Sequence, residues 1–331
     1  MSRPEPNTYL HPNYRGWHNA PPFRCYAAAQ WGGDGAVFFG VKFNGEVVLT
    51  IEDPRGGWSP WIEDWSGPMR PRFITKLGAV GHQDGLQAWG IDDSMQLWSV
   101  AQDSNRLWGN WEGPNWNNAP PVHRVVAAKL GGTKTAAVWA ITATDYSLIS
   151  CYKEAGAWSP WSTAYPPPQV SRFTEITAAQ QGNGCAAFWA LDTRLQLWYM
   201  FELTPGGAWS GWLGPDWNGA PLDWDRTGVP FFNHLAACQQ GGARGATLFA
   251  IAHVNVKNSY QETAGGNWSA WSTSMGTTFH GARSIALAAA QQHDGTIRLW
   301  STWPDDLSLC SVAQTSAGGE WGKWWTPWTP Q

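Results

Sequence analysis

Two tryptophans three residues apart recur along the whole chain, and this repeat constrains the fold more than any other feature. Six copies of the Trp-x-x-Trp pair begin, in steps of 50 to 59 residues, at Trp58, Trp108, Trp158, Trp209, Trp268 and Trp321. A second marker, an aromatic residue followed by a small one, precedes each pair by 19 to 21 residues and begins at Phe39, Trp89, Trp139, Trp189, Phe249 and Trp300. A period of this length is typical of β-propeller blades.

Each copy divides into four short extended runs separated by turn residues. In the fourth copy these runs cover residues 176–180, 185–191, 195–201 and 208–212. Four short antiparallel strands make one propeller blade, and no window keeps a helical apolar period long enough to predict a helix. The sequence therefore predicts an all-β fold, a six-bladed β-propeller with four antiparallel strands per blade.

Side-chain size along each copy fits blades that converge on a central axis and spread at the rim. The first run is rich in Ala and Gly, the second carries one large aromatic residue, and the fourth carries the Trp pair. Small residues inside and indoles outside fill a wedge at interior density. We expect an N-terminal closure segment, residues 1–22, and one propeller domain, residues 23–331, with blades at 23–70, 71–121, 122–169, 170–228, 229–278 and 279–331.

A longer period overlies the six copies. A five-residue motif begins at Trp17, Trp116 and Trp217, which are 99 and 101 residues apart. In this motif the Trp is followed first by His or Asn, then by Asn or Gly, and then by Ala-Pro. These segments come before the first copy and after the second and fourth. The pattern predicts a pseudo-threefold pairing of blades, in which the N-terminal segment supplies the tail that the sixth copy lacks. The ring would then close without a swapped strand.

Composition excludes several classes of partner. The net charge is −4 and no Lys/Arg cluster is present, so nucleic acid is not an expected partner. No apolar stretch is long enough for membrane insertion, and the first residues lack the apolar core of a signal peptide. We expect synthesis in the cytoplasm and, for any release, a non-classical route. The five Cys residues show no C-x-x-C spacing and are interpreted as buried free thiols.

Catalytic and metal-binding patterns are not found. The eight His residues lack metal-ligand spacing. Acidic residues at Asp53, Glu202 and Glu262 are interpreted as equivalent late third-strand positions in different blades, too far apart to work as a catalytic pair. We therefore expect a protein that is not an enzyme and that uses no cofactor and no metal.

The tryptophans fall into three groups with different expected roles. Those on second strands, Trp89, Trp139, Trp189 and Trp300, are expected in the core. Residues three apart on a regular strand point to opposite faces, so each Trp-x-x-Trp pair is expected to send one indole toward each neighbouring blade. The linker tryptophans Trp17, Trp116 and Trp217 lie in loop-like sequence, which leaves two alternatives, a binding surface or docking onto the next blade.

Half-covered indoles at the rim suggest a ligand. One face of a pyranose ring is an apolar patch that suits an indole, and nearby Asn, Gln and Ser can satisfy its hydroxyls. The pattern favours a carbohydrate-binding lectin whose partners are glycans or glycoconjugates and whose several grooves act together by multivalency. The alternatives are a protein-binding scaffold and, less favoured, a glycoside hydrolase. The sequence makes no prediction of the oligomeric state.

The repeat text also carries a resemblance to a known family. Residues 178–198, followed by Gly-Gly-Ala-Trp-Ser-Gly-Trp ending at Trp212, resemble the blade of bacterial propeller lectins of the Photorhabdus type and, more loosely, tectonin repeats. The resemblance covers residues 23–331, although those lectins look seven-bladed where this chain has six copies. It implies sugar sites in the grooves between blades, with fucose-like or O-methylated sugars as ligands. It also implies stacking platforms at the second Trp of each pair, namely Trp61, Trp111, Trp161, Trp212, Trp271 and Trp324.

Overall fold

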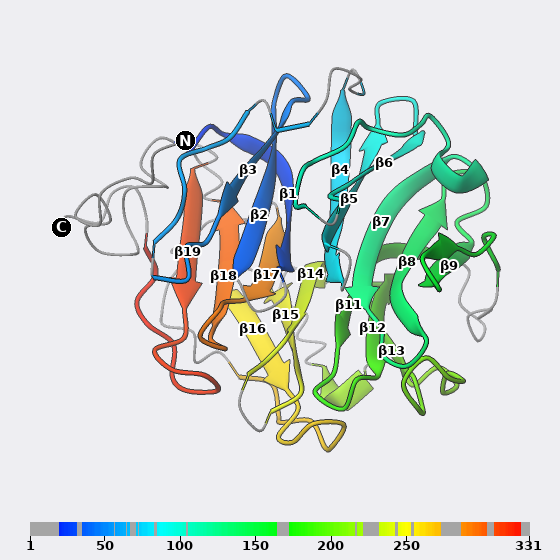
Figure 1. The fold of residues 1–331 in the computed structure, drawn as a ribbon. Coiled ribbons are helices and arrows are strands. Elements are labelled where there is room, and N and C mark those ends of the chain that lie inside the picture. Colours follow the sequence, from blue (N-terminus) through cyan, green and yellow to red (C-terminus); the bar gives the residue numbers. More distant parts are fainter. Residues whose placement is uncertain are drawn as a thin grey trace.

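The computed structural model contains six antiparallel sheets, which follow one another along the described part of the sequence (Figure 1). It describes residues 20–31, 35–55, 57–63, 65–66, 71, 73–82, 85–103, 105–163, 172–215, 217–220, 232–241, 244–252, 255–272, 286–302 and 308–325. Apart from two short 3-10 segments, the described residues contain no helix, as predicted, and so no helix that could cross a membrane.

Each sheet is one blade, numbered 1 to 6 along the chain. The first three blades contain β1 (Phe23–Gln30), β2 (Ala36–Lys42) and β3 (Val47–Ile51); β4 (Ile74–His82), β5 (Gly85–Asp92) and β6 (Leu97–Ala101); and β7 (Val122–Lys129), β8 (Lys134–Thr142), β9 (Leu148–Glu154) and β10 (Ala157–Trp158). The last three contain β11 (Phe173–Gln180), β12 (Ala186–Asp192) and β13 (Leu197–Phe201); β14 (Phe232–Gln239), β15 (Ala246–Ala252) and β16 (Asn255–Tyr260); and β17 (Leu287–Gln291), β18 (Ile297–Thr302) and β19 (Leu309–Ala313).

The first strands of the blades form the inner ring of the molecule (Figure 1). Neighbouring first strands contact one another in the order β1, β4, β7, β11, β14 and β17, and β17 contacts β1 again. The blade interiors are filled by the second-strand aromatics, with Trp89, Trp139, Trp189 and Trp300 at most 1% exposed. The prediction of a six-bladed β-propeller with these tryptophans in its core is confirmed.

The outer run of each blade is more irregular than the predicted fourth strand. Within the described residues, only blade 3 has a named fourth strand, β10, and in the other blades the outer run is held by two isolated bridges. In blade 1 these bridges join Glu52 to Trp58 and Leu49 to Ile62. The outer run therefore has one residue more than the third strand between the two bridges, which is a β-bulge.

A serine hydroxyl stabilises this bulge. In blade 1 the Ile51 amide donates a hydrogen bond of 3.0 Å to Ser59 Oγ, and in blade 4 the Phe201 amide donates one of 3.0 Å to Ser210 Oγ. The same contact occurs in blades 3 and 5. The Ser after the first Trp of these pairs is thus explained by a backbone amide that the interrupted ladder leaves without a backbone acceptor.

The bulge also corrects the expected orientation of the Trp pairs. Trp58 and Trp61 pack in the same apolar cluster, between blades 6 and 1, where Trp58 contacts Trp300 and Trp61 contacts Phe23. Both members of the other five pairs likewise share one cluster, each at the junction with the preceding blade. The expectation of one indole on each side was wrong because the extra residue shifts the alternation by one.

The linker segments dock onto the next blade. Trp116 begins a 3-10 segment, η2 (Trp116–Asn118), and Trp217 begins another, η3 (Trp217–Gly219). Both indoles are buried, at 6% and 8% exposure. The following asparagine donates in each case to the serine carbonyl of the next Trp-Ser pair, Asn117 to Ser159 at 2.9 Å and Asn218 at 2.8 Å in the second linker. Of the two alternatives, docking is therefore observed for these two linkers, while Trp17 lies outside the described residues.

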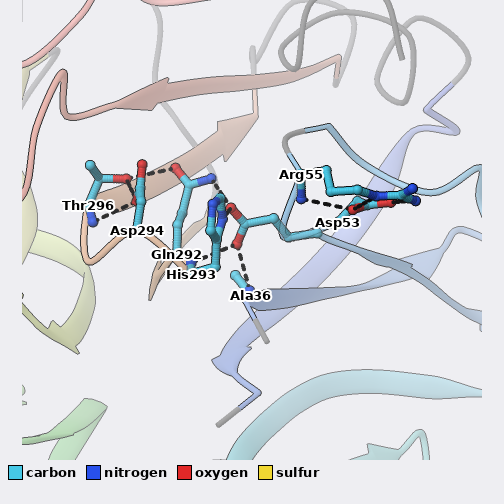
Figure 2. A network of polar contacts seen from close by, with 8 residues as sticks. Ala36, Asp53, Arg55, Gln292, His293, Asp294 and Thr296 are labelled. Carbon is cyan, nitrogen blue, oxygen red and sulfur yellow. Dashed lines mark hydrogen bonds and ion pairs between the residues drawn. The ribbon is translucent and has the colours of Figure 1, made fainter. Parts of the chain in front are cut away.

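The ring closes between blade 6 and blade 1 through side chains. The outer run of blade 6 pairs Trp321 with Gln314 and so comes from the C-terminal part of the chain, without a swapped strand. Glu52 of blade 1 receives hydrogen bonds from Gln292 and His293 of blade 6 (Figure 2). The five cysteines are free and buried, as predicted.

Candidate functional site

A groove between blades 5 and 6 contains a cavity of about 420 Å³. Its volume lies within the range of small-molecule sites. Blade 5 contributes residues from the segment between β14 and β15, from β15 and from β16. Blade 6 contributes the turn after β19 and the first Trp of its pair. The lining residues are Gln240, Arg244, Thr247, Asn258, Tyr260, Gln314, Gly318, Gly319, Glu320 and Trp321.

The floor of the cavity is polar and buried. Gln240 and Asn258 are 2% and 3% exposed, and the Thr247 hydroxyl donates to Gln240 Oε1 at 2.7 Å. The Asn258 Oδ1 atom is also buried, but it has no hydrogen-bond partner among the described residues. Leaving a buried acceptor unpaired costs about 1–3 kcal/mol. A ligand that donates a hydrogen bond to Asn258 would remove this cost.

The walls combine a cation with aromatic rings. The Arg244 guanidinium carbon lies 4.1 Å from the centroid of the Tyr260 ring, and Arg244 forms no ion pair with the described residues. The half-buried Trp321 meets Phe249 edge to face at 5.6 Å. The guanidinium therefore has donors to offer to a ligand beside an aromatic surface.

The turn after β19 brings blade 6 against Arg244. Gly318 has a φ of +68°, which L side chains rarely adopt, and a Cβ there would lie 3.4 Å from Arg244 Cδ. The Thr315 amide donates to the Glu320 carbonyl at 2.8 Å and closes the turn. The positive φ explains the glycine at this turn, and the turn sets Glu320 and Trp321 at the groove.

A related arrangement occurs at the junction of blades 3 and 4. The Lys134 ammonium lies 4.2 Å from the centroid of the Tyr152 ring. Tyr152 and Tyr260 occupy the same ladder position. Each pairs with the residue that lies two positions before the second-strand aromatic residue of its blade. Glu202 of blade 4 has a buried Oε1 atom without a hydrogen-bond partner among the described residues. A cation over a tyrosine is thus found in two odd-numbered blades.

The acidic residues considered as catalytic candidates are structural or isolated. Glu202 accepts the Ala186 amide at 2.9 Å, and its equivalent in blade 1 is Glu52, which accepts the Ala36 amide at 2.8 Å. Burial raises the pKa of Glu202. The assumed equivalence of Asp53 and Glu262 with Glu202 was wrong by one residue. Asp53 instead forms an ion pair with Arg55 at 2.9 Å (Figure 2). Among the described residues no group of His, Cys, Asp and Glu could hold a metal ion.

None of the predicted binding tryptophans that the structure describes lines the cavity between blades 5 and 6. The structure buries Trp111, Trp116 and Trp217, whereas five others are half-buried in the junction clusters: Trp61, Trp161, Trp212, Trp271 and Trp324. The ninth, Trp17, lies outside the described residues. The cavity uses the first Trp of its pair, Trp321, whereas the resemblance implied the second.

Sequence reasoning also missed Arg244, Tyr260 and Asn258. Asn258 pairs with the second-strand aromatic residue of its blade, and the same ladder position holds Leu49, Ser99, Ser150, Tyr199 and Ser311 in the other blades. Because three of these five residues are serine, a polar residue at this position gave no signal in the sequence. Arg244 carried none, because its role depends on a blade-to-blade contact that one repeat does not show.

Comparison with known proteins supports the architecture. No protein-family model matches the chain, and no curated protein matches it. Among solved structures, a mutant Aleuria aurantia lectin in complex with Fucα1-6GlcNAc is similar with a TM-score of 0.64 and 16% identity, over 94% of this chain and 99% of that one. AofleA from Arthrobotrys oligospora gives 0.62 and 13%, over 96% and 94%. The Burkholderia pseudomallei lectin BP39L gives 0.55 and 14%, over 92% and 99%. The likeness shows the same propeller fold; these structures do not include a lectin of the Photorhabdus type.

Proposed function

We propose that the protein is a non-catalytic lectin that binds a fucose-like sugar in the groove between blades 5 and 6. One observation carries the proposal. The cavity places a half-buried indole, an arginine without an ion pair among the described residues, and a buried amide oxygen without a partner around one space. This set can hold a ligand that has an apolar face and several hydroxyls.

Each side chain has a distinct part in such binding. The apolar face of a pyranose ring packs against Trp321, while a ring hydroxyl donates to Asn258 Oδ1. The Arg244 guanidinium donates to further hydroxyls, and the exposed Glu320 can accept from one. Glu320 is the one carboxylate among the described residues that line the cavity, whereas glycoside hydrolysis generally needs a pair of Asp or Glu residues, which favours binding without reaction.

The solved structures favour the sugar class. Two of them are described as complexes, the Aleuria aurantia lectin with Fucα1-6GlcNAc and the SapL1 lectin with α-methyl fucoside. The junction of blades 3 and 4, with Lys134 over Tyr152, is the second site that we propose. Two sites on one ring would raise a weak single-site affinity on a glycan-covered surface.

Calorimetric titration with methyl α-L-fucoside tests the proposal. Arg244→Ala should weaken binding at its groove by about 10- to 100-fold, the value of a hydrogen bond to a charged group. The matched control is Arg194→Ala, which removes the same charge from an exposed turn of blade 4. Lys134→Ala should act in the same way on the site proposed between blades 3 and 4.

A glycan array that includes fucosylated and O-methylated glycans identifies the sugar. Retention of no glycan by the wild-type protein, together with a protein partner that co-purifies, would replace the lectin by the scaffold alternative. Equal binding by the Arg244 and Arg194 variants would reject this groove as the site.

A further inference from the structure

The inner ring of first strands surrounds a channel, and one end of it holds a cavity of about 130 Å³. Five first strands each place one ionisable side chain there, Arg24 on β1, Lys76 on β4, Arg124 on β7, Glu175 on β11 and His234 on β14. Lys76, Arg124 and Glu175 share one position in their blades. Each directly follows a β-bulge or irregularity in the pairing of the first strand with the second. The six-fold arrangement of the blades therefore gathers groups that are distant in sequence.

Positive charge exceeds negative charge at this channel end. Arg124 Nε donates to Glu175 Oε2 at 3.1 Å, so one cation has a counterion. Arg24 lies over Phe73, with its guanidinium carbon 4.6 Å from the ring centroid. Lys76 forms no hydrogen bond or ion pair with the described residues. Three cations thus face one carboxylate.

His234 adds no positive charge to this channel end at pH 7. Burial, with Lys76 and Arg124 nearby, lowers the pKa of His234 to about 4, so the ring is neutral at pH 7. Burial lowers the pKa of Lys76 as well, and repulsion from Arg124 adds to the effect. A partly buried cation beside like charges is costly unless an anion compensates it.

The opposite end of the same channel lacks this excess. Its cavity of about 80 Å³ is lined by Ala and Gly residues and, among larger polar side chains, by Lys129 and four glutamines, Gln30, Gln180, Gln239 and Gln291. The charge is therefore a property of one end and does not follow from the fold itself. The charged end has room for a small ion, since one water occupies ~30 Å³ in the liquid.

We propose that this channel end binds a small oxyanion, sulfate or phosphate, either free or as a substituent of a sugar. The Lys76 ammonium and the Arg124 guanidinium donate to its oxygens, and the neutral His234 ring has one further N–H to offer. The site is separate from the groove between blades 5 and 6 and does not depend on the lectin proposal.

Calorimetric titration with sodium sulfate and sodium phosphate, at an ionic strength held constant with sodium chloride, tests this site. We expect Lys76→Met to weaken sulfate binding at least 10-fold. Lys129→Met is the matched control, because it removes one charge from the other end of the same channel, and it should bind as the wild type does. Without sulfate, Lys76→Met should unfold at no lower temperature than the wild type, because it removes an uncompensated cation.

Two further arms separate the outcomes. Displacement of sulfate by galactose 6-sulfate would identify a sugar-borne anion, and failure to displace it would identify a free ion. Methyl α-L-fucoside should bind Lys76→Met and the wild type equally, so that a failure of either proposal is visible by itself. Absence of sulfate binding in the wild type, or an equal loss in both Lys variants, would overturn the site. Lys76→Gln replaces Lys76→Met if circular dichroism shows that the latter is unfolded.

Discussion

The contact that closes the ring gives a quantitative prediction for stability. Glu52 is 3% exposed and accepts four hydrogen bonds (Figure 2): from the Ala36 amide at 2.8 Å, from Gln292 Nε2 at 2.8 Å, and from the amide and Nδ1 of His293 at 3.3 Å and 2.8 Å. The first lies within blade 1, and the other three join blade 1 to blade 6. Glu52→Ala removes all of them from a buried position.

Glu202 is the matched position in blade 4 and separates the two contributions. It accepts the Ala186 amide at 2.9 Å and the Gly206 amide at 3.4 Å, and no side chain of another blade donates to it among the described residues. Losing such a contact costs about 1.5–3 kcal/mol, and each donor left unpaired costs about 1–3 kcal/mol. We expect Glu202→Ala to cost about 1–3 kcal/mol and Glu52→Ala about 3–5 kcal/mol of the free energy of unfolding.

Urea unfolding followed by tryptophan fluorescence measures both values by linear extrapolation. The difference of about 2 kcal/mol is the contribution of the contacts between the first and last blades. Equal destabilisation by the two variants would show that these contacts add nothing to the backbone contact, and the closure argument would be refuted. Gln261 of blade 5 holds the same position as an amide and donates to Gln181 at 2.6 Å. Glu52→Gln should therefore lie between the wild type and Glu52→Ala.

Two further predictions concern protonation. Because the pKa of His234 is about 4 in the fold against 6.5 when exposed, the unfolded chain gains a proton below pH 6.5 that the native protein does not. The free energy of unfolding should fall from pH 6.5 toward pH 5, with a contribution from His234 that approaches about 1.4 kcal/mol per pH unit. The raised pKa of Glu175 acts in the opposite direction, and comparison with His234→Gln isolates the contribution of the histidine. An unchanged slope in His234→Gln would contradict this. Burial raises the pKa of Cys25 and of Cys151 to about 12, so Ellman's reagent should label the folded protein slowly and all five thiols in urea. Rapid labelling of the native protein would exclude that account.

The architecture could be predicted because its determinants are local. Each blade carries its own turns, its small inner residues and its second-strand aromatic, so one repeat text contains the information for one blade, and six copies give the number of blades. The burial of Trp189 or Trp300 follows from the same pattern. No contact between distant segments has to be known for these conclusions.

The orientation of the Trp pairs could not be predicted from spacing alone. A regular strand places residues three apart on opposite faces, but the bulge held by Ser59 inserts one residue and brings Trp58 and Trp61 to the same junction. The cavity was beyond sequence reasoning for a different reason. Arg244 and Trp321 meet only because blades 5 and 6 stand side by side, and the two residues belong to different parts of their repeats.

At several junctions an indole that follows the Trp pair of one blade packs against the first Trp of the next pair. In the junction of blades 2 and 3, the linker indole Trp116 lies 5.2 Å from Trp158, the first Trp of its pair, and in the junction of blades 4 and 5, Trp217 lies 4.9 Å from Trp268. Trp65 likewise lies 4.6 Å from Trp108 in the junction of blades 1 and 2. Trp321 is the first Trp of the pair in the junction of blades 5 and 6, where it lines the open cavity instead. At the other three junctions an indole from the preceding blade thus occupies the space that a ligand would need.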